Sequence, residues 1–590
     1  MPAYVSLDLF RFLLLEAHCI QDLFQYPHFA HFDESTVDLT LQAAKDWSDV
    51  ELQPYFRVMD EQPAYWQDGR VHTHEQVGRV LRGAGENGWI GARDDFDLGG
   101  MQMPEMLYVA LHGIFEAANN SAQGYLGLTG GAARLITTFG SPELIATYVP
   151  PMYAGQWQGT MALTEPQAGS SLTDITTSAQ PTTDGYYRIK GQKIFISGGD
   201  HSGADNFVHL TLARIAGAPP GVKGISLFVI PRLRPEEDNS LVFNDVQTAA
   251  DFQKLGQRGY STTHLIYGEN DDCRGWLVGE PHQGLAYMFQ MMNEARIGVG
   301  HTAASVAMAA YLASYQYAQE RPQGRLPGNR DPLALPVPIA RHADVQRMLL
   351  TQQVIVEGSL SLAAFCCRLS DLAHVITDAT QKQETWLLLE ILTPVVKTYS
   401  TEQGIRAVGL GLQVLGGYGF TMDFPLQQYY RDIRIMAIYE GTTGIQSLDL
   451  LGRKVLLENG RAFQLLLAEM RKTVEKAAAD PDLQPFAQAL RTDIDRFNQV
   501  TQHLVAFAKA GQAERFTADA TVYMEMTGLI VIAWQWLHLA LAAQQHRAGG
   551  RFSPDFYAQV RRCLHFYFRY ELPHAEAHAR TLTEGEPVYA

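Results

Sequence analysis

The spacing of apolar residues divides the chain into helical and β-rich stretches. Residues 1–158 show mostly helical patterning. In ADVQRMLLTQQVIVEGSLSLAAF the apolar side chains, Val345, Met348 and Leu349 among them, recur at steps of three and four. Between residues 159 and 280, short runs such as YYRIKGQKIFIS and GISLFVIP alternate with Gly, Pro, Asp and Asn. That texture is typical of strands joined by turns, so the pattern predicts helices on both sides of a small β domain.

The chain is too long for one compact core, and we interpret its changes of texture as domain boundaries. Its 590 residues allow several domains. We predict an α+β protein with an antiparallel β domain in the middle and helical domains around it. The predicted parts are an N-terminal extension (1–40), an N-terminal helical domain (41–158), the β domain (159–280), a second helical domain (281–455) and a C-terminal helical domain (456–590).

One stretch, MTGLIVIAWQWLHLALAA at 526–543, is nearly long and apolar enough to span a membrane. Gln535 and His538 interrupt it, and no basic cluster adjoins one of its ends. We therefore predict a buried helix of a C-terminal bundle and no stable membrane insertion. The apolar N-terminus is interrupted by Arg11 and Glu16 and carries no basic leader, so no signal peptide is expected.

Charge and cysteine content narrow the function classes. The net charge of −17 disfavours nucleic-acid binding by the whole surface, and residues 461–590 are balanced, with 14 Lys and Arg against 14 Asp and Glu. Five cysteines without a CxxC pair disfavour a disulfide framework and fit a reducing, cytoplasmic compartment. His574 and His578 could share a helix face, but a third ligand is not evident, so we predict no metal site.

Two segments of the β region combine groups that suit a flat ligand with polar edges. In MALTEPQAGSSLTD (161–174) a strand leads into a Pro/Gly/Ser turn that exposes backbone N–H groups and hydroxyls. In GQKIFISGG (191–199) alternation with Ile194 and Ile196 predicts that Phe195 and Ser197 share one face of a strand. Each segment by itself also fits a plain hairpin turn or a half-buried strand.

Two later segments add glycine and an isolated carboxylate. The glycines of QVLGGYGF (413–420) permit close backbone approach to a bulky ligand that carries phosphate. In IMAIYEGTTGIQ (435–446) one carboxylate, Glu440, stands among apolar and small neighbours. Neither segment alone identifies a chemistry.

Taken together, the motifs LTEPQAGS, GQKIFIS, RPQG, QVLGGYGF and IYEGTTGIQ resemble, in order and spacing, the acyl-CoA dehydrogenase family of flavoproteins. The resemblance covers residues 75–455. The extensions at both ends resemble the longer bacterial branch of that family, which includes methylthiopropionyl-CoA dehydrogenases and broad-range enzymes. The resemblance implies the family fold, an oxidoreductase of fatty acid and lipid metabolism, and FAD bound between the β domain and the second helical domain.

The resemblance also implies which residues hold FAD. Phe195 takes the place of a family tryptophan near the isoalloxazine, Ser197 offers a hydroxyl at the ring edge, and Thr442 offers one on the phosphate side. The other expected FAD contacts are Met161, Leu163, Thr164 and Ser170, through backbone and hydroxyl groups, and Arg321 and Gln323 at the pyrophosphate.

A further FAD segment is expected to act across a subunit boundary. Gln413, Gly416 and Gly417 match residues that the family donates to the FAD of a neighbouring subunit, so the resemblance implies a homo-oligomer, a homodimer or a dimer of dimers. Two departures affect FAD contacts. RPQGR lacks the usual aromatic residue beside the adenine side, and Gly444 replaces a glutamine. Water or another residue would have to supply the missing pyrophosphate contacts.

Glu440 matches the family's catalytic base. A base for the weakly acidic α-proton needs a pKa raised toward neutrality, and apolar neighbours such as Met436 and Ile438 would raise the pKa of Glu440 by desolvation. The small residues that follow would let the Glu440 backbone N–H approach the thioester carbonyl and stabilise the developing enolate. The alternative is a solvated or ion-paired glutamate near Arg434.

Some family members carry the base immediately before an arginine on an early helix, which corresponds here to MMNEARIG (291–298). The residue before Arg296 is Ala295, and Glu294 is rotated by about 100° on a helix, so this base is absent. The resemblance implies substrate contacts from Ser170, Asn293, Arg296 and Gly441. For Arg296 a buried structural ion pair is an equal alternative.

The expected activity is FAD-dependent α,β-dehydrogenation of an acyl-CoA thioester to the trans-2-enoyl-CoA, with electrons passed to an electron-transfer flavoprotein. Two alternatives remain at this point. One is an acyl-CoA oxidase that uses oxygen, and the other is a DNA-associated flavoprotein of the alkylation-response type. The motifs do not predict the length of the acyl chain.

Overall fold

A computed structural model describes residues 3–236, 238 and 240–588, with the side chains of 289–293 outside the described part. The chain forms two compact units. The first comprises residues 1–42, 104–117 and 295–590, and the second comprises 43–103 and 118–294. Three long helices have residues in both: α2 (Glu34–Glu51), α5 (Glu105–Phe139) and α7 (Gly284–Glu320).

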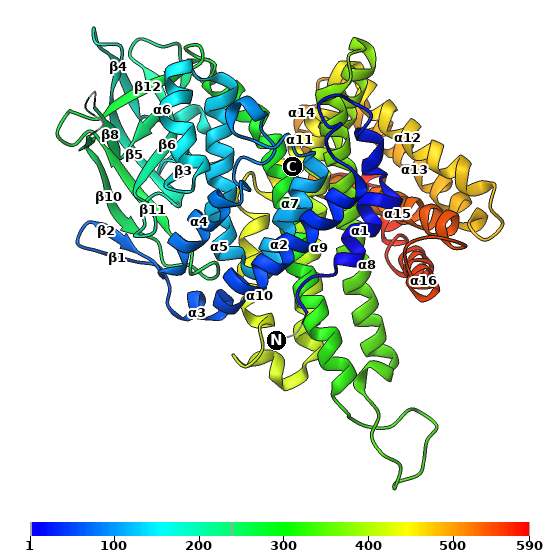
Figure 1. Cartoon of the computed structure of the whole chain (residues 1–590). Helices are drawn as coiled ribbons and strands as arrows, with labels where there is room; N and C mark the ends of the chain where they lie inside the picture. The colour runs from blue at the N-terminus through cyan, green and yellow to red at the C-terminus, as the bar shows by residue number, and fades with distance from the viewer. Residues whose placement is uncertain (1–2, 237, 239, 589–590) are drawn as a thin grey trace. The chain divides into compact units, whose positions relative to one another are not determined.

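The second unit is built around a β-sheet, as predicted (Figure 1). The strand order is β10-β11-β5-β12-β7-β6-β3, and β4 pairs with both β5 and β6. Short, β-branched and aromatic runs between turns produce these strands. Their bounds are β3 Trp157–Ala162, β4 Ser178–Pro181, β5 Tyr187–Ser197, β6 Asn206–Ile215, β7 Ile225–Pro231, β10 Val246–Asp251, β11 Thr262–Tyr267 and β12 Arg274–Val278.

The sheet is not purely antiparallel, which corrects the prediction. Strand β6 pairs in parallel with β3 and with β4, whereas the other pairings are antiparallel. The chain leaves β3, passes through the 163–177 turn and forms β4 and β5 before it returns as β6. Strands separated by so long a connection are free to align in parallel, which a hairpin turn does not allow.

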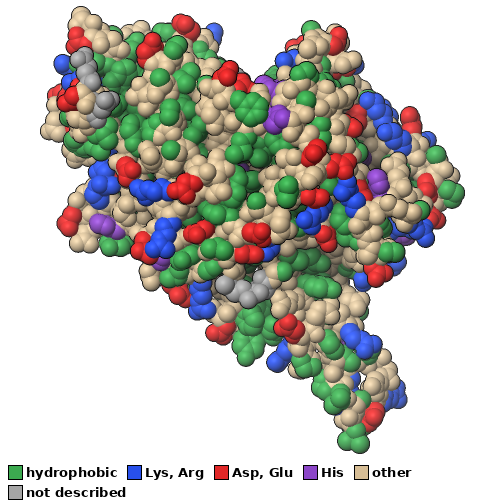
Figure 2. All heavy atoms as spheres, viewed as in Figure 1, with side chains coloured by type: hydrophobic (Ala, Val, Ile, Leu, Met, Phe, Trp, Pro, Cys, Tyr) green, Lys and Arg blue, Asp and Glu red, His purple; other side chains and the backbone are tan. Residues whose placement is uncertain are grey.

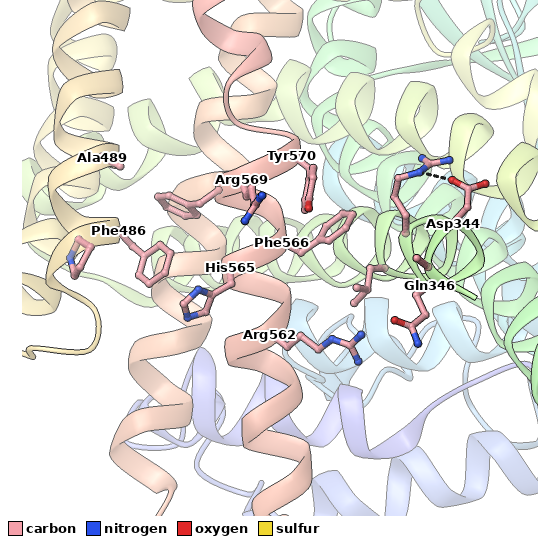
Figure 3. A pocket seen from close by; sticks show the side chains of 14 residues that line it. Asp344, Gln346, Phe486, Ala489, Arg562, His565, Phe566, Arg569 and Tyr570 are labelled. Carbon is pink, nitrogen blue, oxygen red and sulfur yellow. Dashed lines mark hydrogen bonds and ion pairs between the residues drawn. The ribbon is translucent and has the colours of Figure 1, made fainter. Parts of the chain in front are cut away.

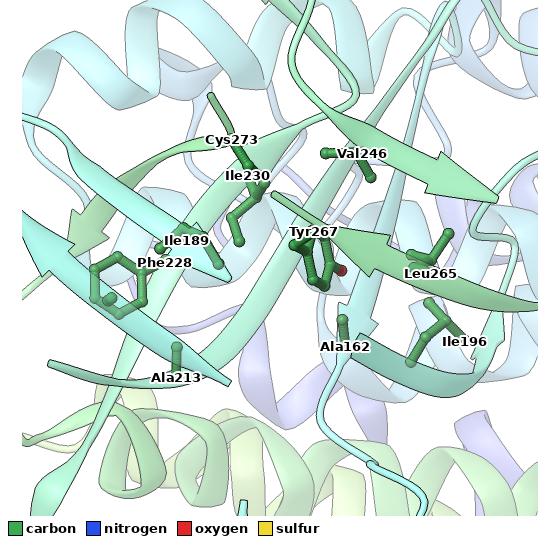
Figure 4. Packing of buried hydrophobic residues seen from close by; sticks show 11 residues of the cluster. Ala162, Ile189, Ile196, Ala213, Phe228, Ile230, Val246, Leu265, Tyr267 and Cys273 are labelled. Carbon is green, nitrogen blue, oxygen red and sulfur yellow. The ribbon is translucent and has the colours of Figure 1, made fainter. Parts of the chain in front are cut away.

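One apolar core stabilises this sheet (Figure 4). Phe228 and Ile230 of β7 are fully buried, as are Leu265 and Tyr267 of β11. All seven positions of β7 are buried, so this strand lacks the alternation of a half-exposed strand. The core holds the sheet rigid beneath the turns that the sequence singled out.

Smaller elements complete the second unit. Helix α6 begins after Ser141, whose hydroxyl accepts the Leu144 N–H, as its position before Pro142 suggests. Two hairpins, three helices and four 3₁₀ turns make up the set: β1 Tyr65–Gln67, β2 Arg70–His72, β8 Leu233–Pro235, β9 Leu241–Phe243, α3 Phe56–Glu61, α4 Gln76–Glu86, α6 Pro142–Tyr153, Gln53–Tyr55, Phe96–Leu98, Leu172–Asp174 and Val222–Gly224.

The first unit is helical, and a hairpin of two long helices, α8 and α9, runs through it (Figure 1). Of the apolar residues on α8 that the pattern singled out, Met348 and Leu349 are buried and Val345 is half-buried. Its helices are α1 Leu7–Arg11, α8 Ala343–Val375, α9 Ala379–Val414, α10 Leu426–Ile433, α11 Thr443–Gly452, α12 Arg461–Ala478, α13 Gln484–Lys509, α14 Ala513–Thr517, α15 Ala520–His546, α16 Pro554–Tyr570 and α17 His574–Thr583. A π-helix spans Phe12–Ala17, and 3₁₀ turns span Ile20–Leu23, Ile339–Arg341, Gly416–Phe420, Arg434–Ala437 and Lys454–Gly460.

Helix α15 attaches the C-terminal helices to α8. The Trp536 indole donates to the Val354 carbonyl of α8 at 3.1 Å, and the Trp534 indole donates to the Thr473 hydroxyl of α12 at 2.8 Å. Both indoles are buried, which confirms the predicted buried helix. Trp536 therefore ties α15 to the second helical region, and Trp534 ties it to the other C-terminal helices.

Three helical segments among the described residues are long and apolar enough, by length and composition only, to cross a membrane. They are Glu294–Glu320, Ala343–Val375 and Ala513–His546. Between 78% and 89% of their most apolar windows is buried inside the protein. Packing within the fold is therefore sufficient to explain their composition. On the face drawn in Figure 2, acidic and basic side chains are interspersed.

Candidate active site

Glu440 lies in a strained turn between the 3₁₀ turn Arg434–Ala437 and helix α11. Glu440 and Gly441 both have left-handed backbones, with φ of +54° and +89°. A Cβ at position 441 would lie 2.6 Å from the Gln446 amide nitrogen, and the left-handed backbone there would strain any residue with a side chain, so glycine is favoured. A non-glycine residue in this region costs roughly 1–3 kcal/mol, and such strain clusters at functional sites.

The Glu440 side chain is half-buried, and its surroundings shift its proton affinity as the sequence predicts. Desolvation raises the pKa of Glu440 above its ordinary value, although the positive charges of Lys397 and Arg296 pull it down. The positive charges that lower the pKa of Glu440 thus come from α9 and α7. Arg434, the ion-pair partner considered from the sequence, is exposed. A carboxylate with a raised pKa is suited to take a proton from carbon.

Arg296 is committed to an ion pair, the alternative that the sequence left open. Its side chain is buried, and its guanidinium contacts the Asp449 carboxylate of α11 at 2.8 Å. The rejected base, Glu294, pairs with Arg93 at 2.9 Å and with Arg134 at 3.5 Å. These pairs neutralise Glu294, which supports Glu440 as the base. The side chain of Asn293 lies outside the described residues.

Thr442 is the N-cap of helix α11. Its hydroxyl oxygen accepts the Ile445 N–H at 3.3 Å, so the hydroxyl proton remains available to donate outward. The N-terminus of α11 also presents backbone N–H groups and the positive end of the helix dipole. Both features are compatible with the phosphate-side role expected for Thr442.

In the second unit the two flavin motifs of the β region come together. The Thr164 carbonyl accepts the Ile194 N–H at 2.9 Å, and the Leu163 carbonyl accepts a hydrogen bond from the Lys193 Nζ at 2.9 Å. Met161, Leu163 and Thr164 are half-buried, and Ser170 is exposed on the turn. Strand β3 ends the strand order, so among the described strands it has a ladder partner on one side only.

Glu165 organises this junction, a role that the sequence analysis missed. Its buried carboxylate pairs with Lys193 at 2.9 Å and accepts hydrogen bonds from the backbone and hydroxyl groups of Thr176 and Thr177. Burial would raise the pKa of Glu165, but Lys193 and these hydrogen bonds outweigh burial and lower it to about 2. The available signal was a charged residue in each of two largely uncharged segments, Glu165 and Lys193. The sequence alone does not show that these two residues pair.

The regular alternation predicted for Phe195 and Ser197 is wrong in detail. The pairing of β5 with β11 shifts register between Ile196 and Lys193, and Phe195 has a left-handed backbone with φ of +59°. This bulge reorients the strand locally. Phe195 is 57% exposed, its ring centroid lies 4.6 Å from that of Phe252, and Ser197 is half-buried. An exposed phenyl ring on a strained backbone is available to a ligand.

The remaining predicted FAD residues lie on the surface of the first unit. Gln413, at the end of α9, is exposed, as are Gly416 and Gly417 in the turn that follows. A Cβ at Gly417 would meet nothing within 4 Å, so packing within this chain does not require glycine there. Arg321 and Gln323 are exposed where α7 ends and the proline-rich loop begins.

A separate cavity of about 920 Å³ lies among α8, α13 and α16 (Figure 3). Phe486, Phe566 and Arg569 contribute to its lining, and none of the predicted site residues does. The cavity therefore does not bear on the chemistry at Glu440. Within the described ranges we find no cluster of three His, Cys, Asp or Glu side chains that could hold a metal ion.

Comparison with known families accounts for nearly the whole chain. Sequence models of the acyl-CoA dehydrogenase N-terminal, middle and C-terminal domains match residues 37–156, 160–269 and 282–456. A model described as acetyl-CoA dehydrogenase C-terminal like matches residues 466–589.

Two curated relatives are similar over most of their length. The chain is 37% identical over 506 residues to a 3-methylmercaptopropionyl-CoA dehydrogenase of Ruegeria pomeroyi, covering 85% of this chain and 84% of the relative. It is 33% identical over 466 residues to the broad-specificity linear acyl-CoA dehydrogenase FadE5 of Mycobacterium tuberculosis, covering 76% and 75%.

Two solved structures share the fold. An acyl-CoA dehydrogenase from Bacillus anthracis, complexed with FAD, superposes with a TM-score of 0.75 at 21% identity, over 97% of this chain and 91% of that one. Caenorhabditis elegans ACDH-11, in complex with C11-CoA, gives 0.76 at 19% identity, over 98% and 93%. At these identities the likeness concerns the fold alone.

The fold is that of an FAD-dependent oxidoreductase, with helical domains around a β domain. The chain belongs to the acyl-CoA dehydrogenase family. Membership confirms the expected resemblance, the enzyme class and FAD as the cofactor.

Proposed function

We propose that this protein converts an acyl-CoA thioester to its trans-2-enoyl-CoA, with Glu440 as the base and an electron-transfer flavoprotein as the electron acceptor. The observation that supports this most directly is the strained turn that presents a half-buried carboxylate of raised pKa. Family membership supports the reaction class.

The residues of the second unit fit the ring of a flavin. The exposed phenyl of Phe195 offers a stacking surface, and the half-buried Ser197 hydroxyl lies two residues further along the same strand. The segment that follows β3 is hydrogen-bonded to the bulged strand, since the Thr164 carbonyl accepts the N–H of Ile194, the residue next to Phe195. An aromatic face bordered by polar groups is what a planar heterocycle requires.

The first unit holds groups that suit a phosphate. The Thr442 hydroxyl can donate outward, and the α11 N-terminus favours negative charge. The open space around Gly416 and Gly417 allows close approach by a bulky group from another chain. These glycines support the proposal of a homo-oligomer in which Gln413 and its neighbours serve a second subunit.

The step that the protein's own residues would carry out is removal of the substrate α-proton. Bound FAD supplies the two-electron acceptor that takes a hydride from the substrate β-carbon. The ionised Glu440 carboxylate removes the α-proton and holds it on an oxygen, and a raised pKa makes it a stronger base for this step. The Glu440 N–H donates to the thioester oxygen as negative charge develops there, which lowers the barrier to enolate formation.

Phe195→Ala is expected to weaken FAD affinity about tenfold, because a stacking surface is lost. The ring is mostly exposed in the fold, so the melting temperature of the apoprotein should change little. Titration of apoprotein with FAD, followed by quenching of flavin fluorescence, measures the effect. Phe243→Ala, which removes another half-exposed phenyl from the second unit, is the matched control. Unchanged FAD affinity in Phe195→Ala would remove Phe195 from the site.

The substrate range is proposed from the relatives. The Ruegeria relative is named for 3-methylmercaptopropionyl-CoA, and the mycobacterial relative is named for linear acyl-CoA thioesters. Short thioesters with and without sulfur, together with longer linear ones, are therefore the panel to test.

A cytoplasmic location is also proposed, supported by five cysteines that are all free thiols.

The decisive experiment mixes the purified yellow protein with each thioester under anaerobic conditions and follows flavin absorbance. Bleaching by at least one acyl-CoA, with enoyl-CoA as product, is the expected result. Addition of electron-transfer flavoprotein should then restore turnover, whereas oxygen alone should not. Bleaching followed by rapid reoxidation in oxygen would identify an oxidase. No bleaching by any thioester would overturn the proposed reaction.

A further inference from the structure

A buried lysine lies beside the turn that carries Glu440, and no motif identifies it. Lys397 is in the middle of α9 and is fully buried. Its Nζ donates a hydrogen bond to the Gly441 carbonyl at 2.8 Å. A buried ammonium group is unfavourable unless hydrogen bonds or opposite charges compensate for its lost hydration. A buried ammonium group that contacts the residue next to the proposed base therefore needs a structural or functional explanation.

Two side chains hold the carbonyl groups of the strained turn. The Gln446 amide nitrogen donates to the Glu440 carbonyl at 2.9 Å, and Lys397 holds the next carbonyl. The C=O and N–H of a trans peptide point in opposite directions. Anchoring the two carbonyls therefore also fixes the N–H groups of Gly441 and Thr442. Without these anchors a left-handed glutamate has no reason to stay in this conformation.

Lys397 also supplies charge next to the base. Burial lowers the pKa of Lys397 to about 8, although Glu440 and Glu402 oppose the shift, so the ammonium is largely retained near neutral pH. Arg296 is the other cation that acts on Glu440, but Asp449 already pairs with it at 2.8 Å. Of the two cations that act on Glu440, the charge of Lys397 is therefore less fully neutralised than that of Arg296.

The other charged groups packed around the turn are engaged elsewhere. Glu402 of α9 is exposed and accepts the Thr443 hydroxyl, and Lys454 forms an ion pair with Glu390 of α9. Neither contributes a resolved shift to the pKa of Glu440, whose pKa responds to desolvation, Lys397 and Arg296. Loss of the Lys397 charge should therefore be felt directly at the base.

We propose that Lys397 is a positioning residue for the base: it anchors the Gly441 carbonyl, which sets the orientation of Glu440, and its charge keeps the enclosed carboxylate ionised. The inference rests on the proposed function of Glu440. It predicts two separable effects, one on the geometry of the turn and one on the pH at which the base becomes active.

The test compares holoenzyme variants Lys397→Met, Lys397→Gln and Lys397→Arg with the wild type across the pH range. In Lys397→Met the acid limb of kcat/KM should move to higher pH by about one unit, since a nearby positive charge stabilises the ionised carboxylate. At pH values below this limb the rate should fall by up to about tenfold, since one pKa unit corresponds to a factor of ten. Lys397→Arg keeps the charge and should keep the acid limb, even if its rate falls.

Lys397→Gln separates the two effects, because it can donate to Gly441 but carries no charge. It should share the shifted acid limb and retain FAD, and it substitutes for Lys397→Met if that variant does not fold. Lys382→Met, which removes an exposed lysine from the same helix, is the control and should match the wild type. FAD content and melting temperature are recorded for each variant.

An acid limb that stays at the wild-type pH in both neutral variants would overturn the proposal, even if turnover fell, because lost packing alone lowers rates without moving the limb. A wild-type protein that no acyl-CoA can reduce would instead overturn the proposed function. The two failures are therefore distinguishable.

Discussion

Glu440→Gln is expected to lower kcat about a thousandfold, within the range that general base catalysis contributes. Glutamine has nearly the same shape, so the left-handed turn and its anchors on Gln446 and Lys397 should persist. The amide cannot accept the α-proton, so the reaction should stop after substrate binding. Anaerobic flavin bleaching measures the rate, and the FAD spectrum and a binding titration with acyl-CoA show that the site is intact.

The matched control for this variant is Glu475→Gln, which neutralises an exposed carboxylate on α12. It should retain wild-type turnover. If Glu440→Gln also kept a near-normal rate, the base would have to be another group and the proposed mechanism would fail. If it lost FAD as well as activity, the loss would reflect the turn rather than proton abstraction.

The second large effect is expected from Glu165→Gln. Removing one partner of a buried ion pair leaves an uncompensated charge, here on Lys193, at a cost of about 3–5 kcal/mol. The melting temperature of the second unit should fall by about 6–20 °C, since 1 kcal/mol shifts a domain of this size by about 2–4 °C. FAD retention should weaken too, because Lys193 also anchors the Leu163 carbonyl. Calorimetry and flavin release on heating measure both effects.

Strand β5 provides the matched control. Lys190, on the same strand as Lys193, pairs with Asp271 at 2.8 Å, but both side chains are mostly exposed. Asp271→Asn should change stability little, because water screens such exposed pairs. A fall in melting temperature as large in Asp271→Asn as in Glu165→Gln would contradict the argument from burial.

The pH dependence gives the Glu165 prediction a sign. Its folded pKa, about 2, is depressed below the ordinary value of 4.5, so the ionised form stabilises the fold. That contribution is fully present above pH 4.5 and is lost as the pH falls toward 2. The difference in melting temperature between wild type and Glu165→Gln should therefore be largest at neutral pH and shrink in acid. A difference that grew in acid would mean that the pair is not ionised in the fold.

The local pattern of the chain was sufficient for the coarse architecture. Helical periodicity identified α8 and its buried face, and the long apolar run at 526–543 identified α15. Short apolar runs between turn residues located the β domain. These features depend on residues close together in sequence, where hydrophobic spacing reports the face that becomes buried. The roles of the individual FAD and substrate residues remain predictions.

Features that depend on distant partners could not be read in this way. Parallel pairing of β3 with β6 depends on how the intervening chain returns to the sheet. The bulge at Phe195 depends on the register of β11, which lies far along the chain. Alternation along β5 alone cannot reveal a register shift in its partner, so the regular strand predicted around Phe195 and Ser197 missed the bulge.

The sequence by itself determined the position of the proposed base, a glutamate among small and apolar residues, and the order of the motifs around it. Only the tertiary structure decided how that glutamate is held and charged. Lys397 lies 44 positions from Gly441, and Lys193 lies 28 positions from Glu165, yet each pair is in hydrogen-bond contact. Burial makes these contacts strong because water no longer competes for the charges, and burial is a property of the packed chain rather than of any segment in it.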